Sequence, residues 1–327
     1  MEYILQVNKL QTVFNTDDGQ VICVDDVSFA LKPGEIIGIV GESGCGKSVT
    51  SLSIIRLLGN KGKVNKGEVY FEGRNLLELN EKQMREIRGN KISMIFQEPM
   101  TSLNPILTIG DQITESIRLH LKKSKSEALK CAVDMLEKVG LPRADKIIND
   151  YPHVLSGGMR QRVMIAMSLV CNPKLIIADE PTTALDVTIQ AQILDLMKKL
   201  SKEFNTAIML ITHDLGVIAE MADKVLVMYA GQVVEEADVY TLFENPKHPY
   251  TQGLMKSIPQ VYTEKIERLT PIPGTVPSVY QKFSGCRFNE RCILATERCR
   301  SEVPRIVDSG NNHKVRCWNY KETSQNR

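Results

Sequence analysis

Residues 41–48 have the types and spacing needed to bind the phosphates of a nucleotide. They read GESGCGKS, in which the glycines leave backbone N–H groups free to converge on phosphate oxygens. Lys47 adds a positive charge at the β/γ end, and the hydroxyl of Ser48 can ligate Mg²⁺. Alone, this pattern indicates nucleotide binding and nothing more specific.

Two further motifs follow later in the chain, at residues 155–159 (LSGGM) and 175–180 (LIIADE). Asp179 and Glu180 end an apolar run, so both carboxylates should lie at the carboxyl edge of a sheet, where α/β folds bind ligands. The alternative is an acidic strand end that only caps the next helix. Residues 156–158 open a predicted helix to about residue 170, whose free N–H groups would form a second anion-binding terminus.

The elements that must position these residues are visible as apolar patterns. A buried strand at 35–40 precedes the glycine loop and a helix at 48–58 follows it, which is the order that phosphate binding requires. A helical subdomain is predicted at about 100–172, where Ser124 and Glu127 form a capping box. In its helix, Leu129, Ala132, Leu136 and Val139 share one face. Further strands at 207–211 and 225–229 alternate with helices at 188–203 and 215–221, as in a doubly wound, mainly parallel sheet.

Composition restricts the class of protein. With 327 residues and 43% hydrophobic residues, the chain can form a large α/β domain with a smaller appendage. A formal net charge of +2 gives no basic field that would call for nucleic acid. No apolar stretch is long enough to cross a membrane, and the first residues lack the pattern of a secretory signal, so we expect a cytosolic chain.

Taken together and in this order, the three motifs resemble the nucleotide-binding domain of ABC ATPases over residues 1–260. The resemblance implies an α/β fold with an ABC-type P-loop NTPase core, an antiparallel β subdomain and a helical subdomain. A small cysteine-rich extension, residues 261–327, would follow this domain.

The resemblance also implies roles for single residues. Asp179 would hold Mg²⁺ through its water shell, and Glu180 would polarise the water that attacks the γ-phosphate. Gln97 would touch Mg²⁺ or that water, and His213 would contact the γ-phosphate and orient Glu180. Phe14, which precedes the first predicted β-hairpin, would stack on adenine, with a core phenylalanine as the alternative.

The expected ATP-binding residues are Phe14, Gly41, Ser43, Gly44, Cys45, Gly46, Lys47, Ser48, Val49, Gln97, Ser156, Gly157, Gly158, Asp179 and Asp186, with Glu180, His213 and Gln97 as catalytic residues. Of these, Ser48, Gln97 and Asp179 would be the Mg²⁺ ligands. In the family, the residues 156–158 of one protomer close over the nucleotide held by another, and residues 184–186 cross the interface. Dimerisation would therefore be part of catalysis.

Finer details at residues 97–105, 182–186 and 248–251, and the tail from residue 272, look like the di- and oligopeptide importer ATPases. That implies a second, paralogous ATPase subunit, two transmembrane permeases and, indirectly, an extracytoplasmic peptide-binding protein, with the chain on the cytoplasmic face of the membrane. A related nickel or other small-solute importer is an alternative. A soluble ABC ATPase acting on nucleic acid or ribosomes is disfavoured, because the chain has one cassette and no long coiled-coil insertion. A regulatory iron–sulfur protein with an incidental ATPase domain would not explain the intact catalytic set.

Eight cysteines fall into two groups. The four in the extension read as a metal centre, since clustered thiols in a reducing compartment favour metal over disulfides. Their wide, irregular intervals favour an iron–sulfur cubane over zinc, with disulfides or free thiols as further alternatives. Some peptide-importer ATPases carry a [4Fe-4S] cluster here, which implies a structural role far from the ATP site. Four arginines would compensate the cluster's charge. The cluster ligands would be Cys286, Cys292, Cys299 and Cys317, the arginines are Arg287, Arg291, Arg298 and Arg300, and the scattered fillers are Cys23, Cys45, Cys131 and Cys171.

Overall fold

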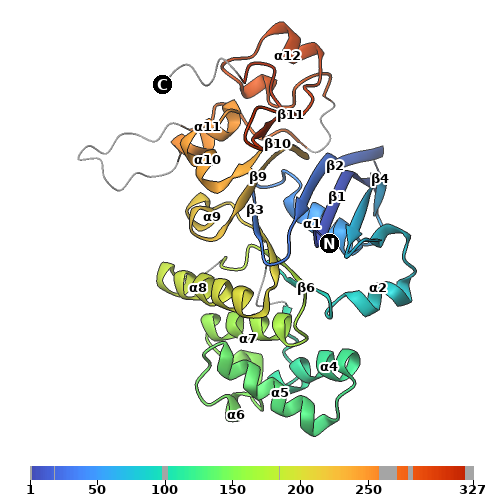
Figure 1. The fold of residues 1–327 in the computed structure, drawn as a ribbon, viewed down its shortest axis with the longest axis vertical. Coiled ribbons are helices and arrows are strands. Elements are labelled where there is room, and N and C mark those ends of the chain that lie inside the picture. The colour runs from blue at the N-terminus through green and yellow to red at the C-terminus, as the bar shows by residue number, and fades with distance from the viewer. Residues whose placement is uncertain are drawn as a thin grey trace, which may run out of the picture. The chain divides into compact units, whose positions relative to one another are not determined.

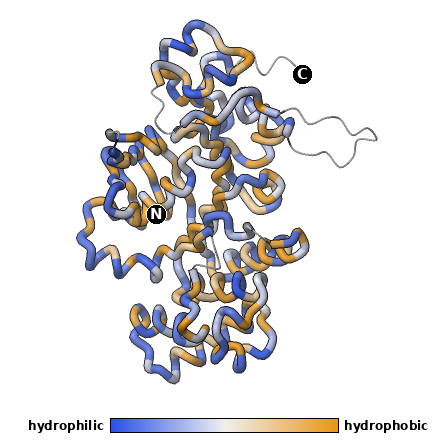
Figure 2. The backbone as a smooth tube through the Cα atoms, turned by 180° about the vertical axis from the view of Figure 1, so that it is seen from behind, coloured by the Kyte–Doolittle hydropathy of each residue, from blue (hydrophilic) through white to orange (hydrophobic). Residues whose placement is uncertain are grey.

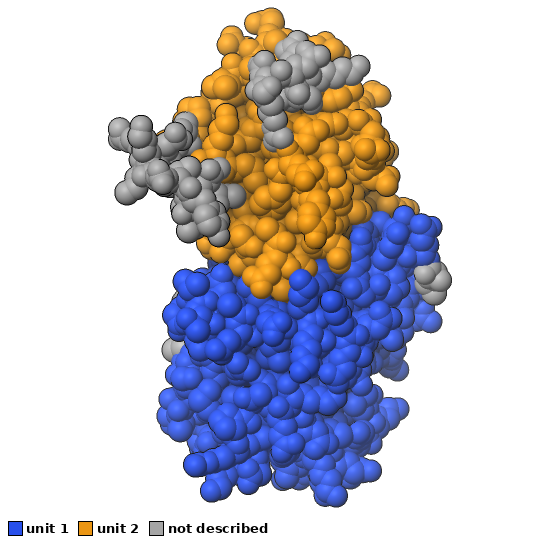
Figure 3. All heavy atoms as spheres, turned by 60° about the vertical axis from the view of Figure 1, so that its left-hand side comes forward, with its two compact units in different colours: residues 1–5, 30–36, 70–211 blue, residues 6–29, 37–69, 212–327 orange. Residues whose placement is uncertain are grey.

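The computed structural model describes residues 2–17, 19–97, 102–183, 185–257, 271–278 and 283–320. These residues form two compact units, each discontinuous in sequence (Figure 3). Unit 1 contains residues 1–5, 30–36 and 70–211, and unit 2 contains residues 6–29, 37–69 and 212–327. The predicted domain boundary between residues 260 and 261 lies outside the described residues.

The sheet of unit 1 is parallel and buried. It consists of β6 (Ile92–Ile95), β7 (Leu175–Asp179) and β8 (Ala207–Ile211), with β7 between the other two. All five residues of β7 and of β8 are buried, as expected for apolar runs covered on both faces. The carboxyl end of β7 therefore places Asp179 and Glu180 at the edge of this sheet.

Between residues 102 and 172, unit 1 is helical in its described part (Figure 1) and contains α4 (Ile109–Leu121), α5 (Lys125–Lys138), α6 (Ala144–Ile147) and α7 (Gly157–Leu169). The capping box at the start of α5 is confirmed, because Ser124 and Glu127 bond each other's backbone N–H. Ala132, Leu136 and Val139 are buried as predicted, but Leu129 is 42% exposed and Ala128 takes its place in the core. The predicted buried face of this helix was thus wrong by one position in its first turn. The other elements of unit 1 are β5 (Arg74–Asn75), η1 (Leu76–Glu78), α2 (Glu81–Ile87), η2 (Pro152–Val154) and α8 (Val187–Phe204).

Unit 2 contains the strand that leads into the glycine loop. β3 (Ile36–Val40) runs parallel to β9 (Lys224–Tyr229), and β10 (Gln232–Asp238) runs antiparallel to β9. The extension continues this sheet, since β12 (Lys314–Val315) pairs with β10 and β11 (Val307–Asp308) pairs with β12. The sequence did not indicate this addition of the tail to the sheet.

The second sheet has the strand order β2-β1-β4-β5, and its long strands are β1 (Leu5–Thr16), β2 (Gly19–Leu31) and β4 (Gly62–Phe71). Buried and more exposed positions alternate along much of these strands, and the tube in Figure 2 accordingly changes between orange and blue there. The helices of unit 2 are α1 (Lys47–Ile54), α9 (Leu215–Met221), α10 (Val239–Glu244), α11 (Pro249–Lys256), η3 (Asn289–Arg291) and α12 (Glu297–Ser301). No helix among the described residues is long and apolar enough to span a bilayer.

Candidate nucleotide-binding site

The glycine loop lies between β3 and α1, in the strand–loop–helix order predicted from the sequence. Three of its glycines have backbones that other residues rarely adopt: Gly41 has φ 154°, Gly44 has φ 79° and Gly46 has φ 101°. A Cβ at Gly41 would lie 2.2 Å from the carbonyl oxygen of Met228, and one at Gly46 would lie 2.7 Å from that of Cys23. The loop therefore needs glycine at positions 41 and 46 to pack against its neighbours.

Lys47 begins α1 and is buried, with 6% of its surface exposed. Its Nζ donates to the carbonyl oxygens of Gly41 at 2.7 Å and Glu42 at 3.1 Å, so the ammonium group is held against the loop. Cys45 lies beside it, with Sγ 3.9 Å from Nζ. Burial raises the pKa of the Cys45 thiol, and the nearby Lys47 opposes part of this rise. The raised pKa favours the protonated thiol, which is consistent with a packing role.

The acidic pair of unit 1 lies at the end of β7, as predicted. Asp179 is buried, and Glu180 follows it in the left-handed region with φ 47°. Gln97 Nε2 donates to Glu180 Oε2 at 3.0 Å, and Thr183 Oγ1 donates to the same oxygen at 3.0 Å. The structure thus brings Gln97 and Glu180 together, although 83 residues separate them. The sequence analysis did not name Thr183, and its position three residues after Glu180 was the signal that could have indicated it.

The residues of the second anion-binding terminus begin α7. Ser156 is the N-cap, and its Oγ accepts a hydrogen bond from Met159 N at 3.3 Å. A Cβ at Gly158 would lie 3.0 Å from Ile189 Cγ2, which explains a small residue there. Asp186 caps α8 by accepting a bond from Ile189 N at 2.9 Å. Residue 184 lies outside the described residues.

Two other predicted residues belong to unit 2. His213 is exposed and stands between the end of β8 and Asp214, the N-cap of α9. Phe14 lies inside β1, near its end, and not ahead of the hairpin as predicted. The ring packs against Gly62, because a Cβ added to Gly62 would lie 2.8 Å from Cε1 of Phe14. The binding and catalytic roles given to all these residues stay predictions.

The four cysteines of the extension share one neighbourhood. The pKa of Cys317 is raised to about 12 by burial and by the other three thiols, and burial raises that of Cys286 to about 11. Among the described residues, however, no group of three or more His, Cys, Asp or Glu side chains is arranged to hold a metal ion. The chemistry of four thiols suits iron–sulfur or zinc, but their arrangement does not form a ligand shell.

Three of the four arginines predicted to compensate a cluster form ion pairs with carboxylates, and their role toward a cluster stays a prediction. Arg287 pairs with Asp25, Arg291 pairs with Glu42, and Arg298 pairs with Glu302. The ion pair to Glu42 also corrects the expectation that the extension is far from the ATP site, because Glu42 belongs to the glycine loop. The partners of Arg287 and Arg291 are distant in sequence, so the local pattern of basic residues did not reveal them.

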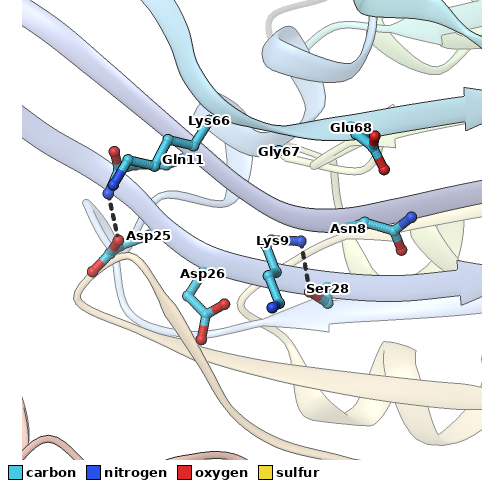
Figure 4. Close-up of a pocket in the computed structure, with 9 residues that line it drawn as sticks. All are labelled: Asn8, Lys9, Gln11, Asp25, Asp26, Ser28, Lys66, Gly67 and Glu68. Carbon is cyan, nitrogen blue, oxygen red and sulfur yellow. Dashed lines mark hydrogen bonds between the residues drawn. The ribbon is translucent and has the colours of Figure 1, made fainter.

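A separate hollow of about 860 Å³ lies over the second sheet of unit 2, between residues of β1, β2 and β4 (Figure 4). Two carboxylates of its lining are already paired with arginines of the extension: Asp25 with Arg287, and Asp26 with Arg316. None of the predicted site residues lines it. The hollow is thus separate from the predicted nucleotide-binding residues.

Comparisons with known proteins agree with these motifs. The ABC transporter family model matches residues 24–183, and the model of the oligopeptide/dipeptide transporter C-terminal region matches residues 234–299. The chain is similar to the oligopeptide transport ATP-binding protein AppD of Bacillus subtilis, with 53% identity over 98% of each chain. It is also similar to the dipeptide transport ATP-binding protein DppD of Escherichia coli, with 48% identity over 96% of each chain.

Among solved structures, the chain resembles the dimeric ATP-binding cassette MJ0796 bound to ADP and phosphate. The TM-score is 0.65 and the identity is 30%, over 72% of this chain and 98% of that one. This likeness confirms the predicted fold class. The glycine loop, the acidic strand end and the C-terminal region thus lie in a chain that matches such ATPases along nearly its whole length, and the protein belongs to the ABC transporter ATP-binding proteins of the dipeptide/oligopeptide subfamily.

Proposed function

We propose that this chain hydrolyses ATP to drive the import of di- or oligopeptides through a membrane ABC transporter. The observation that carries the proposal is similarity to AppD and DppD over at least 96% of the chain, including the C-terminal region. That region lies outside the catalytic motifs, so it supports the transporter class and not only the ATPase chemistry.

In the proposed reaction, the loop residues 41–48 and the N-terminus of α1 bind the phosphates of ATP. Glu180 accepts a proton from the water that attacks the γ-phosphorus, and the bond from that phosphorus to the β–γ bridging oxygen breaks. The hydrogen bonds from Gln97 and Thr183 fix the orientation of the Glu180 carboxylate. His213 would contact the γ-phosphate.

Ser48, Gln97 and Asp179 offer oxygen donors of the kind that Mg²⁺ prefers. The donor types fit the ion, which when bound neutralises charge on the phosphates. Asp179 lies at the carboxyl end of β7, the edge of a parallel sheet where α/β folds bind their ligands.

We further propose that the chain works at the cytoplasmic face of the membrane with a second ATPase subunit, a paralogue, and with two permeases. A second chain is needed because residues 156–158 begin a helix whose N-terminus can bind phosphate, and in the proposed dimer they serve the partner's nucleotide. The dimeric form of MJ0796 supports this arrangement.

The third part of the proposal is a [4Fe-4S] cluster on the four thiols of the extension, with Zn²⁺ as the alternative. The donor type and the shared neighbourhood of the thiols support it. Anaerobically purified protein should contain about four iron atoms per chain and absorb broadly near ~400 nm. Stoichiometric zinc in colourless protein would contradict the cluster.

The function is tested by transport. The chain is reconstituted in proteoliposomes with its partner ATPase and permeases, oriented so that both ATPases and the ATP are inside the vesicles. Uptake of a labelled dipeptide, a labelled hexapeptide and ⁶³Ni²⁺ from outside is then measured. Peptide uptake that depends on ATP supports the proposal. Nickel uptake without peptide uptake would replace it with the alternative importer.

A further inference from the structure

Glu42, the second residue of the glycine loop, forms an ion pair with the C-terminal extension. Arg291 Nη1 donates to Glu42 Oε2 at 2.7 Å, and Arg291 Nη2 donates to Glu42 Oε1 at 2.9 Å. This parallel two-bond geometry is the strongest form of an arginine–carboxylate pair. The Arg291 side chain is 6% exposed and that of Glu42 is 25% exposed, so solvent screens the pair only in part.

Arg291 is itself fixed by neighbours on both sides. Its Nε donates to the carbonyl oxygen of Pro273 at 2.9 Å, and its guanidinium carbon lies 5.7 Å from the ring centre of Tyr229 and 6.0 Å from that of Phe288. Its hydrogen bonds to Glu42 raise its pKa further above its ordinary value. The guanidinium is thus charged and held in one place.

The backbone of Glu42 is held as well. Its N–H donates to the hydroxyl of Tyr250 at 2.9 Å, and Tyr250 is completely buried. The Tyr250 ring packs against Tyr229 at 4.7 Å and Phe288 at 5.5 Å between ring centres. One aromatic cluster therefore connects α11 and the extension to both the backbone and the side chain of a single loop residue.

The charge of Glu42 makes this contact matter for ATP. A carboxylate on a loop that receives the β- and γ-phosphates would repel them, by an energy that grows as water is excluded. Arg291 neutralises the carboxylate, and its two bonds fix where that carboxylate points. Lys47 also donates to the Glu42 carbonyl, so the same residue links the extension to the phosphate-binding lysine.

We propose that Arg291 is a positioning residue for ATP binding, through which order in the C-terminal extension and the affinity of the glycine loop for ATP are coupled. The proposal rests on the assignment of residues 41–48 as the phosphate loop. Because binding couplings are reciprocal, ATP should stabilise the extension by the same factor by which an ordered extension strengthens ATP binding. A change that breaks the contact between Arg291 and Glu42 then lowers ATP affinity.

The test measures the dissociation constant of Mg·ATP by calorimetry on full-length parent, R291M, E42Q and the double variant E42Q/R291M. R291M leaves an uncompensated carboxylate on the loop and should raise the dissociation constant about tenfold. The double variant removes that carboxylate and should return to within about threefold of the parent. A double variant as weak as R291M would show that Arg291 acts only by packing, and would overturn the proposal.

Two controls separate the possible failures. R316M removes another buried arginine of the extension, paired with Asp26 and not with the loop, and should change the dissociation constant less than about twofold. An effect of R316M equal to that of R291M would overturn the specific role of Arg291. K47A tests the loop itself: if K47A weakens binding and R291M does not, the coupling fails while the site stands, and if K47A binds ATP normally, the site assignment fails too.

Tryptophan fluorescence can report on the extension, because the one tryptophan of the chain, Trp318, lies there. Its indole Nε1 donates to the carbonyl oxygen of Glu302, and Arg298 lies over its ring. Saturating ATP should change Trp318 emission in the parent and R316M and leave it unchanged in R291M. An equal ATP-dependent change in R291M would contradict the coupling.

Discussion

Glu180 stands out at the residue scale because its backbone and its side chain are both constrained. A non-glycine residue with φ 47° is held by its surroundings, and such strain collects at functional sites. The bond from Glu180 N to the Ile211 carbonyl oxygen fixes the backbone, while Gln97 and Thr183 fix the carboxylate. A general base needs this kind of fixed orientation toward its water.

Lys47→Ala should weaken Mg·ATP binding by roughly 10- to 100-fold, because it removes the charge placed at the β/γ end of the loop. Calorimetry on the purified chain measures this directly. Lys63→Ala, which removes an exposed lysine of β4, is the matched control and should bind as the parent does. Equal affinity of Lys47→Ala and Lys63→Ala would contradict the phosphate-loop assignment.

The buried side chain of His248 should make the free energy of unfolding depend on pH. Burial, opposed by Glu235, lowers its pKa to about 4 in the folded chain, from about 6.5 when unfolded. The unfolded state therefore binds the proton first as pH falls. Its contribution is present above pH 6.5 and is lost progressively from there to about pH 4, by up to roughly 3 kcal/mol.

Denaturant unfolding of His248→Asn across that pH window should show a flatter decline than the parent. Asn can still accept the N-cap bond that His248 Nδ1 receives from Tyr250 N, so the start of α11 is preserved. His153→Asn, at an exposed position, should keep the parent's slope. Identical slopes for the parent and His248→Asn would rule out His248 as the source.

At the scale of elements, two serine N-caps allow a matched comparison. Ser124 begins α5 with a capping box, and Ser156 begins α7 at the proposed signature. Replacing either with Ala should lower the free energy of unfolding by about 1 kcal/mol, through the loss of a capping bond. Only Ser156→Ala should also lower ATP hydrolysis in the assembled transporter. Equal hydrolysis by both variants would remove Ser156 from the nucleotide site.

Elements with buried apolar runs could be predicted closely, because burial on both faces leaves a continuous signal. The run at 207–211 became β8 with the same bounds, and 225–229 differed from β9 only at Lys224. The pairing of β12 with β10 could not be predicted, because two-residue strands carry no periodicity. The ion pair of Arg291 with Glu42 could not be predicted either, because 249 residues separate the partners. In the sequence, an arginine near cysteines gives no sign that its side chain is buried.

At the scale of the whole molecule, the proposed dimer makes hydrolysis depend on assembly. The purified chain alone should bind ATP but hydrolyse it slowly, and the rate should rise when the partner ATPase and permeases are supplied. Phosphate release measured against added partner checks this. Full turnover by a chain that stays monomeric at saturating ATP, as judged by light scattering, would contradict the composite site.

The most direct test of ATP hydrolysis by this chain is the Glu180→Gln variant in the reconstituted transporter, with Glu203→Gln, an exposed glutamate of α8, as the control. Glutamine keeps the shape of the side chain but loses the base. We predict that the Glu180→Gln transporter binds ATP as tightly as the parent and releases phosphate at least roughly 100-fold more slowly, while Glu203→Gln retains the parent rate. Phosphate release by Glu180→Gln at the parent rate, with the partner subunit inactivated so that only this chain's site is counted, would contradict it.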